Sequence, residues 1–230
     1  MKQWTVQDVM TRDVVTVGTD TPYQEIINVL SKRGISAVPV VDDSRRVLGV
    51  VSEADLLCKV EFAGGDAEPR ILEWGTGNTK RAKAHAGTAA ELMTEPAVTV
   101  QPGSSLTAAA KLLDGEHVKR LPVIDELGRL VGIVARSDLL SVYLRPDHEI
   151  RESIVEDMLW HMLRIDPFEV EVDVLDGVVT LTGSVDRQSS AQIAARVVAT
   201  LPGVVRVVDK LAFRYDDAVV AATTELSERR

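Results

Sequence analysis

A repeat with an offset of 83 residues is the feature that most limits how this 230-residue chain can fold. Residues 6–57, called repeat one below, align without a gap with residues 89–140, called repeat two, with about fifteen identities in about 52 positions. A unit of this size buries only about 60% of its unfolded surface and is marginally stable by itself. We therefore expect the two copies to pack on one another.

Each repeat shows the same order of expected elements, β-α-β-β-α. In repeat one, runs rich in valine predict strands at 14–17, 37–42 and 47–51, and helices follow the first and the third of them. Thr21 precedes a proline and is expected to cap the first helix, and Ser104 holds the matching place in repeat two.

The segment between the repeats, 61–88, is rich in glycine and in mixed charge, which indicates a linker. It contains a short basic patch made of Lys80, Arg81 and Lys83. A solvated face of the linker is the favoured interpretation of this patch over a contact with phosphate.

Composition excludes several classes of function. Thirty-five Asp and Glu against 26 Lys and Arg give a net charge of −9, and aromatic residues make up 4%, which excludes a bulk nucleic-acid binder. The single cysteine, Cys58, cannot form an intrachain disulfide, and no secretory or membrane-spanning segment is evident. We expect a cytoplasmic protein in which Cys58 is a buried apolar residue. The four histidines lack metal spacing and no catalytic motif occurs, so neither a metal site nor an enzyme is expected.

After residue 146 the pattern changes to α-β-β-α-β over about 65 residues. The alternation of polar and apolar residues predicts a sheet covered on one face by two helices. The whole chain is therefore expected to be α+β. The expected elements are a helix at 149–163, strands at 168–174 and 178–185, a helix at 189–201 and a strand at 204–213.

The two repeats resemble the CBS (cystathionine β-synthase) domain. The resemblance rests on Met-Thr near each start, on Val-Pro-Val-Val-Asp and Leu-Pro-Val-Ile-Asp in the middle, and on the endings Gly-Val-Val-Ser-Glu-Ala-Asp-Leu and Gly-Ile-Val-Ala-Arg-Ser-Asp-Leu. It implies a tandem pair, or Bateman module, with domains at 1–60 and 89–145. Such pairs bind adenosine-containing ligands between their copies and commonly form homodimers, so the resemblance implies AMP, ADP or ATP as a regulatory ligand and no required cofactor.

The family's ligand motif is Ser/Thr-x-x-Asp at the start of the last helix, and residues 52–55 match it completely. The resemblance implies that Asp55 takes the ribose hydroxyls and that Ser52 contacts phosphate. The same four residues form a capping box, which would stabilise the helix without any ligand. Both interpretations remain open.

Repeat two departs from this motif, because Ala135 replaces the hydroxyl while Asp138 keeps the acid. Lys119 and Arg120 precede its central strand, where repeat one has Ser36 and Ala37. Arg120 either supplies the cation for a phosphate or belongs to a solvated basic pair.

We expect one dominant nucleotide site, with the Asp55 cleft favoured. The residues that the resemblance assigns to nucleotide binding are Thr16, Ile35, Ala37, Pro39, Ser52, Asp55, Thr99, Lys119, Arg120, Pro122 and Asp138.

The C-terminal region resembles the BON (bacterial OsmY and nodulation) domain, on Leu-Asp-Gly-Val-Val-Thr-Leu-Thr-Gly at 175–183 and Leu-Pro-Gly-Val-Val-Arg-Val at 201–207. It spans 146–216, and 217–230 forms a tail. BON domains are linked to phospholipid or protein binding. Eight basic against thirteen acidic residues in 145–216 disfavour an anionic membrane, so an unidentified protein partner is favoured.

Two functions are consistent with the sequence. The first is a bacterial nucleotide sensor that signals to a partner in trans. The second is a non-catalytic adaptor with degenerate CBS clefts that acts through its BON domain, on a protein or on phospholipid.

Overall fold

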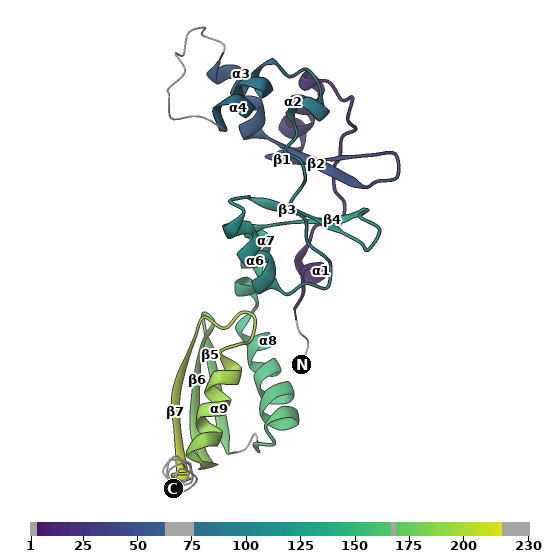
Figure 1. The fold of residues 1–230 in the computed structure, drawn as a ribbon. Coiled ribbons are helices and arrows are strands. Elements are labelled where there is room, and N and C mark those ends of the chain that lie inside the picture. Colours follow the sequence, from purple (N-terminus) through teal and green to yellow (C-terminus); the bar gives the residue numbers. More distant parts are fainter. Residues whose placement is uncertain (1–3, 63–75, 167–168, 218–230) are drawn as a thin grey trace, which may run out of the picture. The chain divides into compact units, whose positions relative to one another are not determined.

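The computed structural model describes residues 4–62, 76–166 and 169–217, with the backbone alone at 76–80 and 161–162 (Figure 1). It divides into two compact units, one of Trp4–Leu139 and one that begins at Leu140. Helices and strands are mixed in both units, which confirms the α+β class. The expected linker glycines between 63 and 75 and nearly all of the tail at 217–230 lie outside the described residues.

The first unit contains the two repeats in the expected order, with one helix between them. Repeat one consists of α1 (Val6–Val9), α2 (Tyr23–Arg33), β1 (Ala37–Val41), β2 (Val47–Ser52) and α3 (Glu53–Glu61). The segment between the repeats contains α4 (Thr76–His85). Repeat two consists of α5 (Ala89–Leu92), α6 (Leu106–Gly115), β3 (Arg120–Ile124), β4 (Leu130–Ala135) and α7 (Arg136–Leu140).

Two local expectations are wrong in detail. The strand expected at 14–17 is reduced to one parallel bridge between Val17 and Val40, because the chain turns immediately afterwards. Helix α2 is capped by Pro22 rather than Thr21, since Pro22 keeps an extended ψ of 150° and the helix starts one residue later. In repeat two the cap is correspondingly Ser105 instead of Ser104, and its hydroxyl accepts the Ala108 N–H at 3.2 Å.

The repeats pack on one another by exchanging their first helices. Helix α1 lies beside repeat two in Figure 1, where Thr11 bridges to Ile133 of β4. The equivalent pair, 83 residues away, is Thr94 with Val50 of β2. Leu92 of α5 is accordingly buried in the core of repeat one. The expectation that the copies pack together is confirmed, and the exchange brings segment 94–98 next to repeat one.

The second unit has the expected order α-β-β-α-β. After the 3₁₀ turn Ser141–Leu144 it consists of α8 (Asp147–Glu152), which continues as a π-helix (Ser153–Met162), then β5 (Val170–Leu175), β6 (Val178–Arg187), α9 (Gln188–Val198) and β7 (Arg206–Tyr215). The sheet order is β5-β6-β7, antiparallel then parallel.

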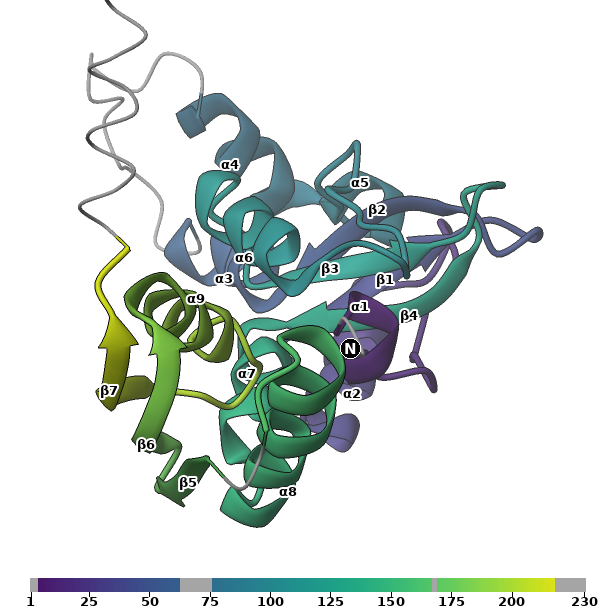
Figure 2. The same cartoon turned by 90° about the horizontal axis from the view of Figure 1, so that it is seen from below.

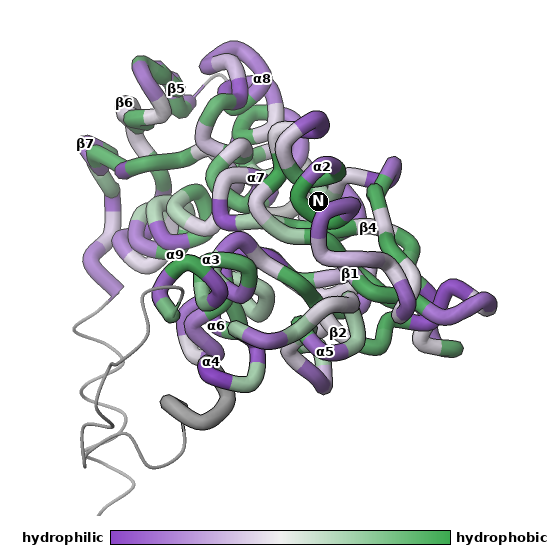
Figure 3. Tube along the Cα trace, turned by 90° about the horizontal axis from the view of Figure 1, so that it is seen from above, coloured by the Kyte–Doolittle hydropathy of each residue, from purple (hydrophilic) through white to green (hydrophobic). Residues whose placement is uncertain are grey.

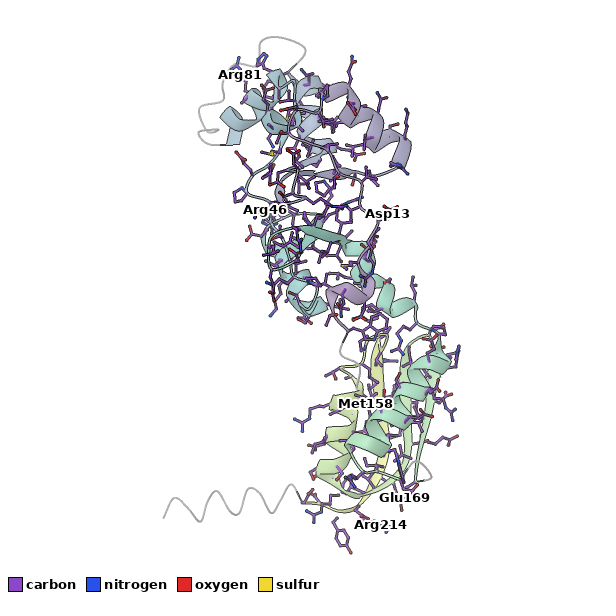
Figure 4. The ribbon with its side chains drawn as sticks, turned by 90° about the vertical axis from the view of Figure 1, so that its right-hand side faces the viewer. Asp13, Arg46, Arg81, Met158, Glu169 and Arg214 are labelled. Carbon is purple, nitrogen blue, oxygen red and sulfur yellow. The ribbon has the colours of Figure 1, made fainter. Side chains whose placement is uncertain are left out.

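Both helices cover one face of this sheet (Figure 2). Met158, which lies between the helix and the strands in Figure 4, is fully buried and packs in one core with Leu159 and Leu181. Along the segment labelled α8, hydrophobic and hydrophilic residues follow one another in Figure 3, as expected of a helix with one buried face.

Candidate functional site

A cavity of about 240 Å³ is lined by both repeats. Repeat one supplies the end of β2 and the start of α3, and repeat two supplies the segments that lead into α6 and β3. The lining residues are Ser36, Ala37, Val50, Ser52, Glu53, Ala54, Asp55, Thr94, Pro96, Ala97, Val98, His117, Val118, Lys119 and Arg120.

The acidic side of the cavity is the beginning of α3. Ser52 is the last residue of β2 and the N-cap of the helix. Its backbone N–H and its hydroxyl both donate to Asp55 Oδ2, at 2.8 and 2.6 Å. The capping interpretation is therefore realised in the structure, and such a cap contributes about 1 kcal/mol. It does not withdraw the carboxylate from the cavity, because Ser52 and Asp55 both line it.

Lys83 overturns the expectation of a wholly solvated linker face. It lies in the last turn of α4 and is only 8% exposed. Its Nζ lies 2.5 Å from Asp55 Oδ1 and 2.9 Å from Thr94 Oγ1. Arg81 precedes Lys83 by two positions, which places it about 200° away around the helix axis. It is exposed and points outward in Figure 4. The side chain of Lys80 lies outside the described residues.

The basic side of the cavity comes from repeat two. Arg120 is the first residue of β3, and its guanidinium donates to Ser36 Oγ of repeat one at 2.9 Å. Arg120 is half-buried, so it does not fit the alternative of a solvated strand end, whereas Lys119 is exposed. His117 and Lys119 line the same cavity. The structure thus brings the complete Ser-x-x-Asp motif of repeat one and the basic pair of repeat two around one space.

Apolar side chains form the remaining wall. Ala97 and Val98 reach the cavity because Thr94 pairs with Val50 of β2, which carries the start of repeat two across to repeat one. Sequence reasoning missed this segment. The sequence does contain a signal for it, because a glycine in a valine-rich strand, here Gly49, often marks the close approach of another chain segment. In the structure, a Cβ atom at Gly49 would lie 2.8 Å from Met93 Sδ.

Five of the expected nucleotide-binding residues line this cavity. They are Ala37, Ser52 and Asp55 of repeat one and Lys119 and Arg120 of repeat two. Its lining does not include six others. Within the described residues these are Thr16, Ile35, Pro39, Thr99, Pro122 and Asp138.

Asp138 lies in the first turn of α7, at the position equivalent to Asp55. Its Oδ2 accepts the N–H of Ala135 at 2.8 Å, which repeats the backbone half of the first capping box. Ile35 is likewise the equivalent of Val118, which does line the cavity. Asp138 and Ile35 are therefore the repeat equivalents of two lining residues, Asp55 and Val118, and lie on the opposite, symmetry-related side of the CBS pair.

Other candidate chemistry is sparse among the described residues. Cys58 is 4% exposed and its thiol faces the Ala54 carbonyl at 3.4 Å, which confirms a buried cysteine. Over the described ranges, no three His, Cys, Asp or Glu side chains are grouped as metal ligands. In the same part of the chain, none of the helices combines the length and apolar character needed to span a membrane.

Comparison with protein families identifies the chain. Models of the CBS domain match residues 6–61 and 89–145, and a model of the BON domain matches 146–215. The chain belongs to the CBS-domain family, as a tandem CBS pair followed by a BON domain. The resemblances inferred from the sequence are confirmed.

Relatives and solved structures match the CBS pair. The crystal structure of CBSX2 in complex with AMP is 31% identical, covers 61% of this chain and 97% of its own, and superposes with a TM-score of 0.54. CBSX1 of Arabidopsis thaliana is 31% identical over 153 residues, which are 62% of this chain and 65% of that protein. An uncharacterised protein of Methanopyrus kandleri is 29% identical over 142 residues, and this chain spans 64% of its length.

Enzymes occur among the relatives, for example the inosine-5'-monophosphate dehydrogenase of Nitrosopumilus maritimus. It is 28% identical over 131 residues, but the match covers only 22% of that enzyme. The family matches in this chain are two CBS domains and one BON domain.

Proposed function

We propose that this protein is a regulatory sensor that binds an adenine nucleotide in the cavity between Asp55 and Arg120. The observation that carries the proposal is the presence of a carboxylate and two basic residues, Lys119 and Arg120, around one cavity of about 240 Å³. A carboxylate can accept both hydroxyls of a ribose, and a guanidinium binds phosphate oxygens in a planar, bidentate manner. The apolar wall at Ala97 and Val98 suits a purine base.

AMP is the preferred member of the nucleotide class. Ligand pockets commonly measure about 300 to 1,000 Å³, and this cavity of about 240 Å³ lies just below that range, which favours the smallest nucleotide of the class. Two cations also match the charge of one phosphate group. The start of α3 adds the partial positive charge of a helix N-terminus. The AMP complex of CBSX2, at 31% identity, supports the same ligand class.

Calorimetric titration tests this proposal. We expect AMP to bind more tightly than ADP or ATP, and Arg120→Ala to weaken AMP binding by about 10 to 100-fold, since a hydrogen bond to a charged group contributes about 1.5 to 3 kcal/mol. The matched control is Arg129→Ala, which removes an exposed arginine that pairs with Asp125 in the β3–β4 turn. Equal affinities for Arg120→Ala and wild type would remove the phosphate role of Arg120.

Regulation in trans is part of the proposal. A ligand shifts only a state to which it binds better, so AMP is expected to change the sedimentation of a CBS-mediated homodimer or to change binding of a protein partner by the BON domain. We infer that the protein acts in the cytoplasm as a regulator without enzymatic activity of its own. If a panel of adenine nucleotides gives no thermal stabilisation, the adaptor function would replace it, because a ligand at about 100 times its Kd adds about 2.7 kcal/mol.

A further inference from the structure

Lys83 is a buried charge that reaches the candidate site from outside both repeats. The residues that follow it, Ala84 and Ala86, are 7% and 3% exposed, and Ala86 belongs to the core of repeat one. This burial fixes the end of α4 against α3. A buried ammonium group is tolerated only when it is paired and hydrogen-bonded, and Lys83 meets that condition through Asp55 and Thr94.

The hydrogen bonds of Asp55 leave room for a ligand. An ionised carboxylate has positions for about four hydrogen bonds. Ser52 occupies two of them on Oδ2, and Lys83 occupies one on Oδ1. One position remains on Oδ1, and a second is vacated on Oδ2 if the Ser52 hydroxyl rotates toward a phosphate. Two ribose hydroxyls can therefore bind while Lys83 stays in place.

We propose that Lys83 is a positioning residue of the nucleotide site, which holds the Asp55 carboxylate in the orientation that receives the ribose diol. This inference rests on the proposed function. Asp55 and Lys83 are 14% and 11% exposed at their side chains, so little water is present to replace the ammonium group. Lys83 also neutralises Asp55, which reduces repulsion between that carboxylate and the phosphate of the ligand. The linker thereby contributes to ligand specificity.

The test measures discrimination between AMP and 2'-deoxy-AMP by calorimetry. In wild type, we expect AMP to bind about 10-fold more tightly, because one hydroxyl bond to a carboxylate is lost in the deoxy ligand. In Lys83→Met this ratio should fall to below about threefold, and AMP affinity itself should fall about 10-fold. Lys83→Arg keeps the charge and should restore part of the ratio. Arg81→Met is the matched control, since it removes a cation from the exposed side of the same helix.

The outcomes separate this inference from the proposed function. Failure of the wild type to bind AMP would overturn the proposed function. A wild type that binds AMP, together with a Lys83→Met variant that keeps the wild-type ratio, would overturn only the role of Lys83. A ratio that falls equally in Arg81→Met would also overturn it, because the effect would then come from net charge.

A second measurement uses the wild-type chain and does not depend on a folded variant. Amine-reactive labelling read by mass spectrometry should modify Lys83 much more slowly than the exposed Lys32 of α2. Adding AMP should slow the labelling of Lys83 further. Faster labelling with AMP would overturn the proposal, because it would mean that the ligand displaces Lys83 from Asp55.

Discussion

The two repeat endings share their backbone and differ in the long-range partner of the acid. In each, the carboxylate accepts the N–H of the last strand residue, Ser52 or Ala135, at 2.8 Å. Asp55 also accepts the hydroxyl of Ser52 and the ammonium of Lys83, whereas Ala135 has no hydroxyl to donate to Asp138. In the second, Arg136 replaces Glu53 and donates to the Leu113 carbonyl of α6 at 3.2 Å. The local fold therefore reproduces a helix cap, whereas the charge environment of each acid comes from elsewhere in the chain.

The largest expected contrast is in stability. Asp55→Ala leaves Lys83 buried without its anion, and breaking a buried ion pair in this way costs about 3 to 5 kcal/mol. Asp138→Ala removes a helix cap, which costs about 1 kcal/mol. Native-state hydrogen exchange of the β1 and β3 amides, compared between each variant and the wild type, measures the stability lost in each repeat.

Equal costs for the two alanine variants would contradict this contrast. The ion pair would then contribute nothing beyond the cap. The double variant Asp55→Ala with Lys83→Met checks the physical cause, because removing both charges should recover part of the stability that Asp55→Ala loses.

Sequence reasoning found the parts of the site that are local. Ser52 and Asp55 were predicted because a motif of four residues carries both the cap and the ligand chemistry. Arg120 was predicted because the 83-residue offset places it opposite Ala37, so the substitution is visible within the chain. The hairpins at 37–42 and 47–51 follow from valine-rich runs and agree with β1 and β2.

The rest of the site depends on topology, which a local pattern does not encode. Lys83 lies in a segment that repeat two does not duplicate, and its glycine-rich surroundings indicate a solvated linker. Its burial arises from the docking of α4 on repeat one. Ala97 and Val98 reach the cavity only because the first helices are exchanged between the copies. The offset between repeats identifies equivalent residues, but it does not tell which copy each segment contacts.

The two strand glycines give the next largest contrast. A Cβ atom at Gly49 would lie 2.8 Å from Met93 Sδ and 2.9 Å from the Thr94 carbonyl, and one at Gly132 would lie 2.5 Å from Met10 Sδ. Either glycine-to-alanine variant should cost about 1 to 3 kcal/mol through overpacking. Only Gly49→Ala displaces the segment at Thr94 that lines the cavity, so it should weaken AMP binding while Gly132→Ala leaves it within about twofold. Equal losses of AMP affinity in both would contradict a site confined to the Asp55 side.

The smallest expected effect lies in the turns between the strands. Asp42 and Asp125 each accept two backbone N–H groups, and Asp125 also accepts Arg129 Nε at 2.8 Å. The backbone N–H of Arg129, followed by its guanidinium, holds the pKa of Asp125 below its ordinary value of 3.8. Because the folded pKa is lowered, this carboxylate stabilises the fold above about pH 4, and the contribution is lost as the pH falls through the folded pKa.

Titration of the Asp125 carboxyl by NMR measures this effect. The midpoint should lie below 3.8 in the wild type. In Arg129→Gln it should rise only part of the way toward 3.8, because the backbone N–H, which is the larger cause, remains in place. A complete return to 3.8 would mean that the guanidinium supplies the whole effect, and the turn of repeat two would then differ from that of repeat one through a single side chain rather than through its backbone geometry.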